Sequence, residues 1–404
     1  MNSLQGKRIL LAMSGGIAAF KVAELARLLI QNGASVQVAM SDAATQFMTP
    51  VTMQALTGQP VYTNQWDARI PNNMAHIELS RKADLILLAP ASADMMAKIS
   101  LGLADDLVSV LCLARECPLI VVPAMNKQMW ENAATQKNVQ TLSANGVGIL
   151  GPTSGSQACG ENGMGRMLEA NEIFEGVAAF FQPKVLTGKK VLITAGPTYE
   201  AIDPVRGITN KSSGKMGFAI AQAAVEAGAQ VHLIAGPCHL DTPLAFTGCI
   251  TRTNVTSAQE MSDAVMKDLN ADIFFAVAAV ADWAIDNIAT QKIKKNNSDS
   301  SANGPQLNFR LNPDILAEVA KKSAATKKPF CVGFAAETND LEAHAKEKRA
   351  KKNIPLLVAN LGPSTFGLDD NELLLVEENN TSKMPRANKL TLARQLITHI
   401  AKKI

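Results

Sequence analysis

Three residues near the start of the chain could bind a phosphate. Ser14, Gly15 and Gly16 follow an apolar run at 8–13 and precede a helical pattern at 17–31. Glycines let a ligand approach the backbone, and the amides at the start of a helix point toward an anion. The order G-x-G-x-x-G of a dinucleotide site is missing. The segment therefore favours a mononucleotide, such as a flavin with one phosphate, over NAD, although a tight strand–helix turn alone also requires glycine.

Three further residues of the first half could take part in chemistry. His76, in MAHIELSRKADL, could bind a carboxylate or move a proton near neutral pH. Asn126 follows an apolar strand, in PAMNKQMW, so its amide could bind a carboxylate or amide. Cys159 lies in the glycine-rich stretch GSQACGENGMGRM, which predicts a flexible loop. Such a loop could close over a site, with Cys159 as a proton donor. The competing interpretations are a surface histidine, a helix-capping asparagine and an incidental loop thiol.

The second half carries residues suited to a nucleotide. Asn210 opens the segment NKSSGKMG, whose hydroxyls, amides and lysines at a helix start form an anion cradle without the order of a Walker loop. Lysines at 292–295 and 348–352 could neutralise a triphosphate and stabilise the charge that develops in transfer. Asp282 could hold a divalent cation between phosphates or bind a sugar hydroxyl. Helix capping and solvated lysines are the competing interpretation.

Short apolar runs alternate with helical patterns and must position these residues. Strands are expected at 8–13, 36–40, 84–90 and 118–123, and their lack of polar alternation suits a parallel sheet covered on both faces. Pro183 and Gly188 break the pattern and predict a linker at 180–190. The pattern then restarts, with strands expected at 190–194, 231–235, 273–280, 330–335, 356–359 and 373–376, and helices at 215–227, 341–352 and 387–403.

These elements predict an α/β protein with two doubly wound, Rossmann-like parallel-sheet domains, residues 1–187 and 188–404. Ligands of such sheets bind beyond the carboxyl ends of the strands. That rule adds Ser41, Ser92 and the segments 195–198, 279–282 and 334–337 to the candidates.

Composition excludes several classes of protein. Of 404 residues, 47% are apolar and 19% charged, which excludes wholesale disorder. The net charge of +3 and the aromatic content of 4% argue against a nucleic-acid binder. Six cysteines without a C-x-x-C disfavour a disulfide framework or zinc site and fit a reducing cytoplasm. The first apolar run is too short for a signal peptide, and no stretch reaches the length of a membrane span.

Together, the motifs resemble one family over nearly the whole chain. The strings SGGIAAFK, PAMNKQMW and SQACGENGMGRM, with the His76 segment, resemble the decarboxylase half of the bacterial bifunctional phosphopantothenoylcysteine decarboxylase / phosphopantothenate–cysteine ligase of coenzyme A biosynthesis. The strings ITAGPTYEAIDPVRGITNKSSGKMG, AAVADW, KIKK, NPDI and GFAAET resemble its ligase half. Each string is modest alone, but their order along one chain is specific.

The resemblance implies two consecutive reactions. The ligase half activates the carboxylate of 4′-phosphopantothenate with CTP and Mg²⁺ or Mn²⁺, and cysteine then attacks the acyl-cytidylate to release CMP. The decarboxylase half uses FMN to oxidise the cysteinyl thiol of 4′-phosphopantothenoylcysteine, so that carbon dioxide can leave, and then reduces the product to 4′-phosphopantetheine. The cycle has no net redox change.

The resemblance also implies roles for individual residues. His76, Asn126 and Cys159 match the active-site histidine, the carboxylate-binding asparagine and the proton donor of the decarboxylase. Asn210 and Lys292 match the ligase residues that handle the acyl-cytidylate and its formation. The expected FMN contacts, by position more than identity, are Ser14, Gly15, Gly16, Ser41 and Ser92. The expected CTP contacts are Ala276, Val277, Ala278, Asp282, Lys292, Asn312, Pro313, Asp314, Ile315, Phe334, Lys348 and Lys352, with Asp282 also the candidate metal ligand.

The resemblance further implies a homo-oligomer, with trimers of the first half and dimers of the second building a dodecamer. Two alternatives remain at this stage. One is a pyridine-nucleotide oxidoreductase, which the missing dinucleotide fingerprint disfavours. The other is a non-enzymatic flavin- or nucleotide-binding module whose lysines contact nucleic acid, which the near-neutral charge disfavours.

Overall fold

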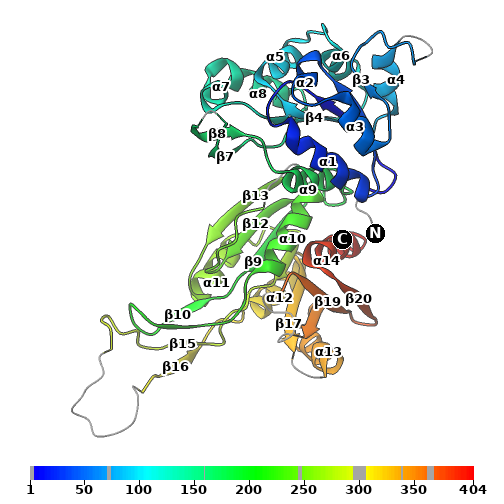
Figure 1. Cartoon of the computed structure of the whole chain (residues 1–404). Coiled ribbons are helices and arrows are strands. Elements are labelled where there is room, and N and C mark those ends of the chain that lie inside the picture. Colours follow the sequence, from blue (N-terminus) through cyan, green and yellow to red (C-terminus); the bar gives the residue numbers. More distant parts are fainter. Residues whose placement is uncertain are drawn as a thin grey trace. The chain divides into compact units, whose positions relative to one another are not determined.

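The chain forms two compact units. A computed structural model describes residues 4–70, 74–158, 160–243, 248–293, 306–337, 340–361 and 368–404. The units are Met1–Phe181 and Gln182–Ile404 (Figure 1). Among the described residues, no helix has the length and apolarity needed to cross a membrane.

The first unit contains a parallel sheet in the order β3-β2-β1-β4-β5-β6. Its strands are β1 (Arg8–Met13), β2 (Ser35–Met40), β3 (Val61–Tyr62), β4 (Leu85–Ala91), β5 (Leu119–Pro123) and β6 (Gly148–Ile149). Its helices are α1 (Ala19–Gln31), α2 (Asp42–Thr45), α3 (Pro50–Thr57), α4 (Ala75–Lys82), α5 (Ala93–Leu101), α6 (Leu107–Ala114), α7 (Lys127–Glu131), α8 (Ala133–Ala144) and α9 (Ala170–Phe180). An antiparallel hairpin, β7 (Thr153–Ser156) and β8 (Asn162–Arg166), completes the unit.

The sequence explains why this sheet is central. All of β4 and β5 is buried, as expected for strands covered by helices on both faces. On one face, apolar residues of α4, α5 and α6 pack on the sheet. The strand order reverses between β1 and β4, so the carboxyl ends of these two strands form a topological switch point, where ligands of such sheets bind.

The second unit repeats this order and extends it. Its main sheet runs β13-β12-β9-β14-β17-β18-β19-β20, parallel as far as β18 and antiparallel beyond. The strands are β9 (Lys190–Ala195), β12 (Gln230–Ala235), β13 (Cys249–Asn254), β14 (Ile273–Ala276), β17 (Phe330–Glu337), β18 (Leu356–Leu361), β19 (Asp370–Val376) and β20 (Thr381–Asn388). The helices are α10 (Lys215–Glu226), α11 (Ala258–Lys267), α12 (Ile315–Thr326), α13 (Leu341–Lys352) and α14 (Lys389–Ala401).

Helices cover both faces of the second sheet. Apolar residues of α10 and α14 form one buried cluster with the sheet, and those of α11, α12 and α13 form the other. Two ribbons, β10 (Tyr199–Ala201) with β11 (Gly207–Thr209) and β15 (Trp283–Ile285) with β16 (Phe309–Leu311), contact each other and extend from this unit as an arm (Figure 1). The switch point lies between β9 and β14.

The predicted fold class and most strands are confirmed, and three elements differ. The strand predicted at 273–280 is regular only as far as Ala276. Beyond it, the amides of Val277 and Ala279 still donate to the carbonyls of Thr194 and Gly196, but among the described residues only an isolated bridge between Ala279 and Pro197 remains. The C-terminal helix begins at Lys389, because residues 381–388 form the unpredicted strand β20.

The third difference is the segment predicted as a flexible loop, which forms the hairpin β7–β8. Glycine at position 165 lets the hairpin pack closely against the turn after β5. A Cβ on Gly165, whose φ is +127°, would lie 2.5 Å from the Met125 carbonyl oxygen. Cys159 and residues 294–305 lie outside the described residues.

Candidate functional site

The switch point of the first unit opens into a cavity of about 620 Å³. It is bordered by the turn after β1, the start of α5, the turn after β5 and the β7–β8 hairpin. Of the residues predicted from sequence, Gly15, Gly16, Ser92 and Asn126 line it. The cavity is therefore built from separate segments that only the fold brings together.

Ser14 joins two of the segments that border this cavity by hydrogen bonds. It is buried, and its hydroxyl donates to the carbonyl of Pro90 (2.8 Å) and accepts from the backbone N–H of Ser92 (2.9 Å). It thus holds the turn after β1 against the turn after β4. Gly15 packs tightly against Ala43, since an added Cβ would lie 2.6 Å from the Cβ of Ala43. Position 15 therefore has no room for a side chain, whereas a Cβ on Gly16 would contact only Pro90, at 3.9 Å.

Helix starts face the same cavity. Ser92 caps α5 by accepting from the N–H of Met95 (3.2 Å), so the first free amides of α5 lie beside the cavity. Asn126 caps α7: its Oδ1 accepts from the N–H of Met129 (2.9 Å), and its amide donates to Gln128 (3.0 Å). The interpretation of Asn126 as a helix-capping residue is therefore correct, and the cap also holds Asn126 at the cavity wall.

The structure adds Lys21, which sequence reasoning missed, to the lining. This lysine is 9% exposed, and its ammonium donates to the Met167 carbonyl (3.0 Å) and to Glu169 (2.9 Å). The hydrogen bond from Lys21, with the positive charges of Lys21 and Arg166, lowers the pKa of Glu169. A lysine on the helix face predicted at 17–31 carries no sequence signal of burial.

Three predicted residues of the first unit are placed elsewhere or are not placed. Ser41 is buried and caps α2 through a bond from the N–H of Ala44 (3.2 Å), outside the lining. His76 lies in α4, also outside the lining, and its Nδ1 is buried without a hydrogen-bond partner. Cys159 lies outside the described residues, although the preceding residues 157 and 158 line the cavity.

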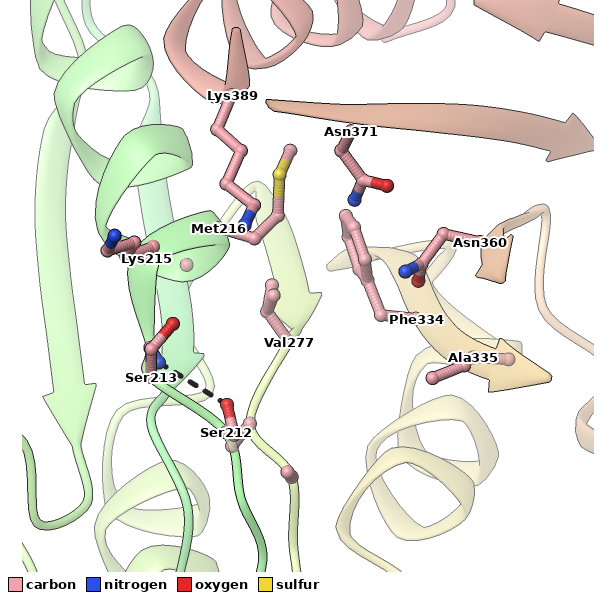
Figure 2. Close-up of a pocket in the computed structure, with 15 residues that line it drawn as sticks. Ser212, Ser213, Lys215, Met216, Val277, Phe334, Ala335, Asn360, Asn371 and Lys389 are labelled. Atoms are coloured by element: carbon pink, nitrogen blue, oxygen red, sulfur yellow. Dashed lines mark hydrogen bonds between the residues drawn. The ribbon is translucent and has the colours of Figure 1, made fainter. Parts of the chain in front are cut away.

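The switch point of the second unit holds a smaller cavity, of about 170 Å³ (Figure 2). Residues 212–217 at the start of α10 form one wall, and Val277, Ala278 and Phe334 form part of another. Gly214 caps α10 with φ of +77°, a conformation that glycine adopts without strain. Ser212 accepts from its N–H (3.3 Å). The predicted anion cradle and three predicted nucleotide contacts thus meet in one cavity.

Two polar residues that sequence reasoning missed point into this cavity. Lys389, at the start of α14, is 8% exposed and extends its ammonium toward the cavity (Figure 2). Burial, followed by the positive charge of Lys215, lowers the pKa of Lys389. Asn371 is buried, and its Oδ1 accepts from the N–H of Glu372 (2.9 Å), which leaves its amide nitrogen directed inward. Nothing in the sequence places either residue at this cavity, because β19 and the start of α14 lie far along the chain from most of the other residues that line it.

A hydrogen-bond network fixes the loop after β14. The amide of Asn210 donates to the Ala279 carbonyl (3.0 Å), and the N–H of Ala281 donates to the buried hydroxyl of Thr198 (3.0 Å). Asn312 donates to the Ala281 carbonyl (2.9 Å), and its Oδ1 is buried without a partner. The free oxygen of Asn312 is an acceptor that a ligand N–H or O–H could satisfy.

The other predicted nucleotide contacts do not line the cavity. Asp314 caps α12 and pairs with Lys352 of α13. Burial acts to raise the pKa of Asp314, but the bonds from Lys352 and from the Ala317 N–H outweigh it and lower the pKa. Ala276 ends β14, and Pro313 and Ile315 flank Asp314. Lys348 lies on α13, and Lys292 and Asp282 are exposed.

A metal site made by the protein alone is absent from the part of the chain that the structure describes. No group of three or more His, Cys, Asp or Glu side chains lies together there.

Comparisons with known proteins agree with this two-part architecture. Residues 1–182 match the Flavoprotein family, and residues 186–404 match the DNA/pantothenate metabolism flavoprotein C-terminal domain. The chain is 51% identical to the coenzyme A biosynthesis bifunctional protein CoaBC of Vibrio parahaemolyticus over 93% of each chain. It is 45% identical to the protein of that name from Escherichia coli K12, over 98% of this chain and 97% of that one.

Two solved structures are also similar to parts of the chain. The C-terminal domain of a CoaBC protein is 35% identical over 55% of this chain and 97% of its own, with a TM-score of 0.45. A mutant PPC decarboxylase, complexed with pantothenoylaminoethenethiol, is 31% identical over 43% of this chain and 98% of its own, with a TM-score of 0.41.

Proposed function

The chain belongs to the CoaBC family of bifunctional coenzyme A biosynthesis enzymes, and from this premise we propose how its two halves divide the work. Residues 188–404 join 4′-phosphopantothenate to cysteine at the expense of CTP. Residues 1–187 then decarboxylate the product to 4′-phosphopantetheine. The observation that carries this division is the presence of one cavity at the switch point of each sheet, each lined by residues of a different predicted set.

In the ligase half, the cavity beside α10 is suited to the CTP phosphates. The start of α10 and the buried ammonium of Lys389 provide positive charge, and Gly214 lets an anion approach the backbone. The carboxylate of 4′-phosphopantothenate displaces pyrophosphate to form an acyl-cytidylate, and the amine of cysteine then displaces CMP. Asn210, fixed by Ala279 at the edge of this region, would bind the acyl-cytidylate, and Lys292 would stabilise charge during activation.

Magnesium is expected to arrive with the triphosphate. Asp282 is exposed, and it belongs to no group of three or more metal-binding side chains among the described residues. It would therefore be one ligand of a magnesium ion that is coordinated mainly by phosphates and water. Removing divalent cations with a chelator should therefore stop pyrophosphate release without unfolding the protein. Added Mg²⁺ or Mn²⁺ should restore the activity.

In the decarboxylase half, the cavity is suited to FMN. Gly15, Gly16 and the capped start of α5 at Ser92 would hold its phosphate, and the volume of about 620 Å³ can accept a flavin ring with part of the substrate. Bound FMN supplies reversible two-electron oxidation of the substrate thiol, which creates the electron sink for loss of carbon dioxide. Asn126 would bind the substrate carboxylate, His76 would complete the active site, and Cys159 would donate the final proton.

We also infer that the enzyme works as a cytoplasmic homo-oligomer, a dodecamer of trimers and dimers. The arm of the second unit exposes Trp283, Phe309 and Leu311 at 55%, 54% and 78%, and such apolar groups on a thin ribbon suit burial against a second copy. The described cysteines at 112, 117, 238, 249 and 331 are free thiols, as a reducing compartment favours.

One reaction followed by mass spectrometry tests the proposal. The purified protein is incubated with 4′-phosphopantothenate, cysteine, CTP and Mg²⁺. Formation of 4′-phosphopantetheine together with CMP is the expected result. Accumulation of 4′-phosphopantothenoylcysteine alone would support the ligase half and show that the first unit has lost its flavin or its partners. A folded, yellow protein that forms neither product would overturn the proposal.

A further inference from the structure

Asp203 is a buried carboxylate with an unusual number of partners. It lies in the turn that joins β10 to β11, at the end of the arm ribbon that leads to Asn210. Its side chain is 0% exposed, although the turn itself belongs to a thin ribbon. A charged group removed from water in this way must be compensated by hydrogen bonds.

Five N–H groups compensate it. Oδ1 accepts from the backbone N–H groups of Val205 and Arg206, both at 2.9 Å. Oδ2 accepts from the Arg206 guanidinium at 3.0 and 2.5 Å, and from the backbone N–H of Ile293 at 3.1 Å. The bonds from Arg206 first, and then those from the backbone, hold the pKa of Asp203 well below its usual range. The carboxylate is therefore ionised throughout the range in which enzymes work.

The partners belong to two segments that are far apart in sequence. Arg206 also donates to the Ile293 carbonyl (2.9 Å), so the peptide groups on both sides of Ile293 are bound to the β10–β11 turn. Ile293 follows Lys292 directly in the sequence. Among the described residues, neither Lys292 nor Ile293 forms a backbone–backbone hydrogen bond. Nearby, the Ala289 N–H donates to the Ile202 carbonyl (3.0 Å) and attaches the preceding residues to the same turn.

The same turn is also connected to Asn210. The ribbon β10–β11 ends one residue before Asn210, and Thr209 donates to the Thr198 carbonyl (2.7 Å) at its base. At that base, Glu200 accepts from the Ala258 N–H (2.9 Å) at the start of α11. The ribbon is thus fixed to the unit at one end and holds the Lys292 segment at the other.

We propose that Asp203 is a positioning residue for carboxylate activation: through Arg206 and Ile293 it holds Lys292 at a fixed place relative to Asn210. This inference rests on the proposed ligase function of the second unit. Asp203 touches neither substrate nor nucleotide in this scheme. Its effect is on the geometry of Lys292, and displacement of a charged group by about 1 Å can lower a rate about 100-fold.

The substitution Asp203→Asn tests the proposal with little change in shape. It replaces one acceptor oxygen by an NH₂ group, which cannot accept from Arg206 or Ile293, and it removes the charge. The matched control is Asp272→Asn. Asp272 also accepts from a backbone N–H, that of Lys190 (2.9 Å), and from a cation, Lys328 (2.7 Å), but it lies at the opposite, amino end of the strands.

Three measurements are made on the full-length protein. The first is steady-state pyrophosphate release at varied CTP with saturating 4′-phosphopantothenate and cysteine, which reports turnover through activation. The second is trypsin cleavage at the Lys292–Ile293 bond, followed by peptide mass spectrometry. The third is decarboxylation of added 4′-phosphopantothenoylcysteine, together with urea unfolding of the second unit. For Asp203→Asn we expect kcat for pyrophosphate release to fall about 100-fold. We expect KM for CTP to change less than about threefold, cleavage after Lys292 to accelerate, and decarboxylation to stay unchanged. Asp272→Asn should retain wild-type activity and cleavage.

The other outcomes separate the two proposals. If Asp203→Asn keeps its kcat, or loses it only in proportion to a lowered urea midpoint that Asp272→Asn shares, the positioning role is overturned. If wild-type protein releases no pyrophosphate, the proposed ligase function fails. The trypsin result then still decides whether Asp203 holds the Lys292 segment, since unchanged cleavage would remove the physical basis of the inference.

Discussion

Arg394 donates through Nε and Nη2 to both carboxylate oxygens of Glu226, at 2.7 and 2.9 Å, and joins the middle of α14 to the end of α10. Both side chains are largely buried, with 18% and 3% exposed. The two helices meet again at the ligase cavity, which is lined by the start of α10 and by Lys389 at the start of α14. The ion pair therefore fixes the relative position of two cavity walls.

Removing the cation of this pair should destabilise the second unit. In Arg394→Met, the Glu226 carboxylate stays buried without its main partner, so we expect the free energy of unfolding to fall by about 3–5 kcal/mol. Urea unfolding, followed by hydrogen exchange of α10 amides, measures it. Arg386→Met is the control, because Arg386 and Asp370 form an exposed pair that solvent and salt screen, so its loss should change stability little. Equal losses in the two variants would contradict a special role for the buried pair.

Much of the fold was predictable from local patterns. The apolar runs at 8–13, 118–123 and 190–194 coincide with strands because buried parallel strands lack polar alternation. The boundaries failed where tertiary contacts decide the backbone. The apolar residues 277–280 resemble a strand continuation, but the regular strand stops at Ala276. Beyond it an isolated bridge joins Ala279 to Pro197, and residues 277–279 line the ligase cavity.

The candidate sites were predictable where a residue follows a strand directly. Gly15, Ser92, Asn126 and Phe334 line cavities, as the rule on carboxyl ends predicts. Lys21 and Lys389 were not predictable, because a lysine on an amphipathic helix normally faces water, and only the three-dimensional packing shows that these two are buried. His76 shows the opposite case: its sequence context predicted an active-site role, but the residue lies in α4 outside the lining of the cavity of the first unit.

Lys389 should contribute to CTP binding. In Lys389→Met the aliphatic stem remains, but the buried positive charge at the cavity is lost. A hydrogen bond to a charged group contributes about 1.5–3 kcal/mol, so we expect KM for CTP to rise at least about 10-fold in pyrophosphate release. Lys402→Met is the control, because Lys402 is an exposed lysine at the far end of the same helix. An unchanged KM in Lys389→Met would exclude contact between this lysine and the nucleotide.

The two activities should be separable by single substitutions. Asn210→Ala removes the amide that is anchored on Ala279, so ligation should fall while added 4′-phosphopantothenoylcysteine is still decarboxylated. Cys159→Ser should leave ligation intact and stall the other half after carbon dioxide is lost, because the hydroxyl is a much weaker proton donor than the thiol. Product analysis by mass spectrometry distinguishes the two blocks. Loss of both activities in either variant would argue against this division of labour.

Gly15 should be required for flavin retention on steric grounds. In Gly15→Ala the new Cβ would lie 2.6 Å from the Cβ of Ala43 and 3.1 Å from its carbonyl carbon, so the turn after β1 must shift. Overpacking of this kind costs about 1–3 kcal/mol, and the shift also moves the wall of the cavity in which we propose that FMN binds. We expect the purified variant to lose most of its flavin absorbance and its decarboxylation while ligation continues. Adding Ala43→Gly removes the closest clash and should restore part of the flavin content, whereas full flavin content in Gly15→Ala alone would show that the turn tolerates a side chain.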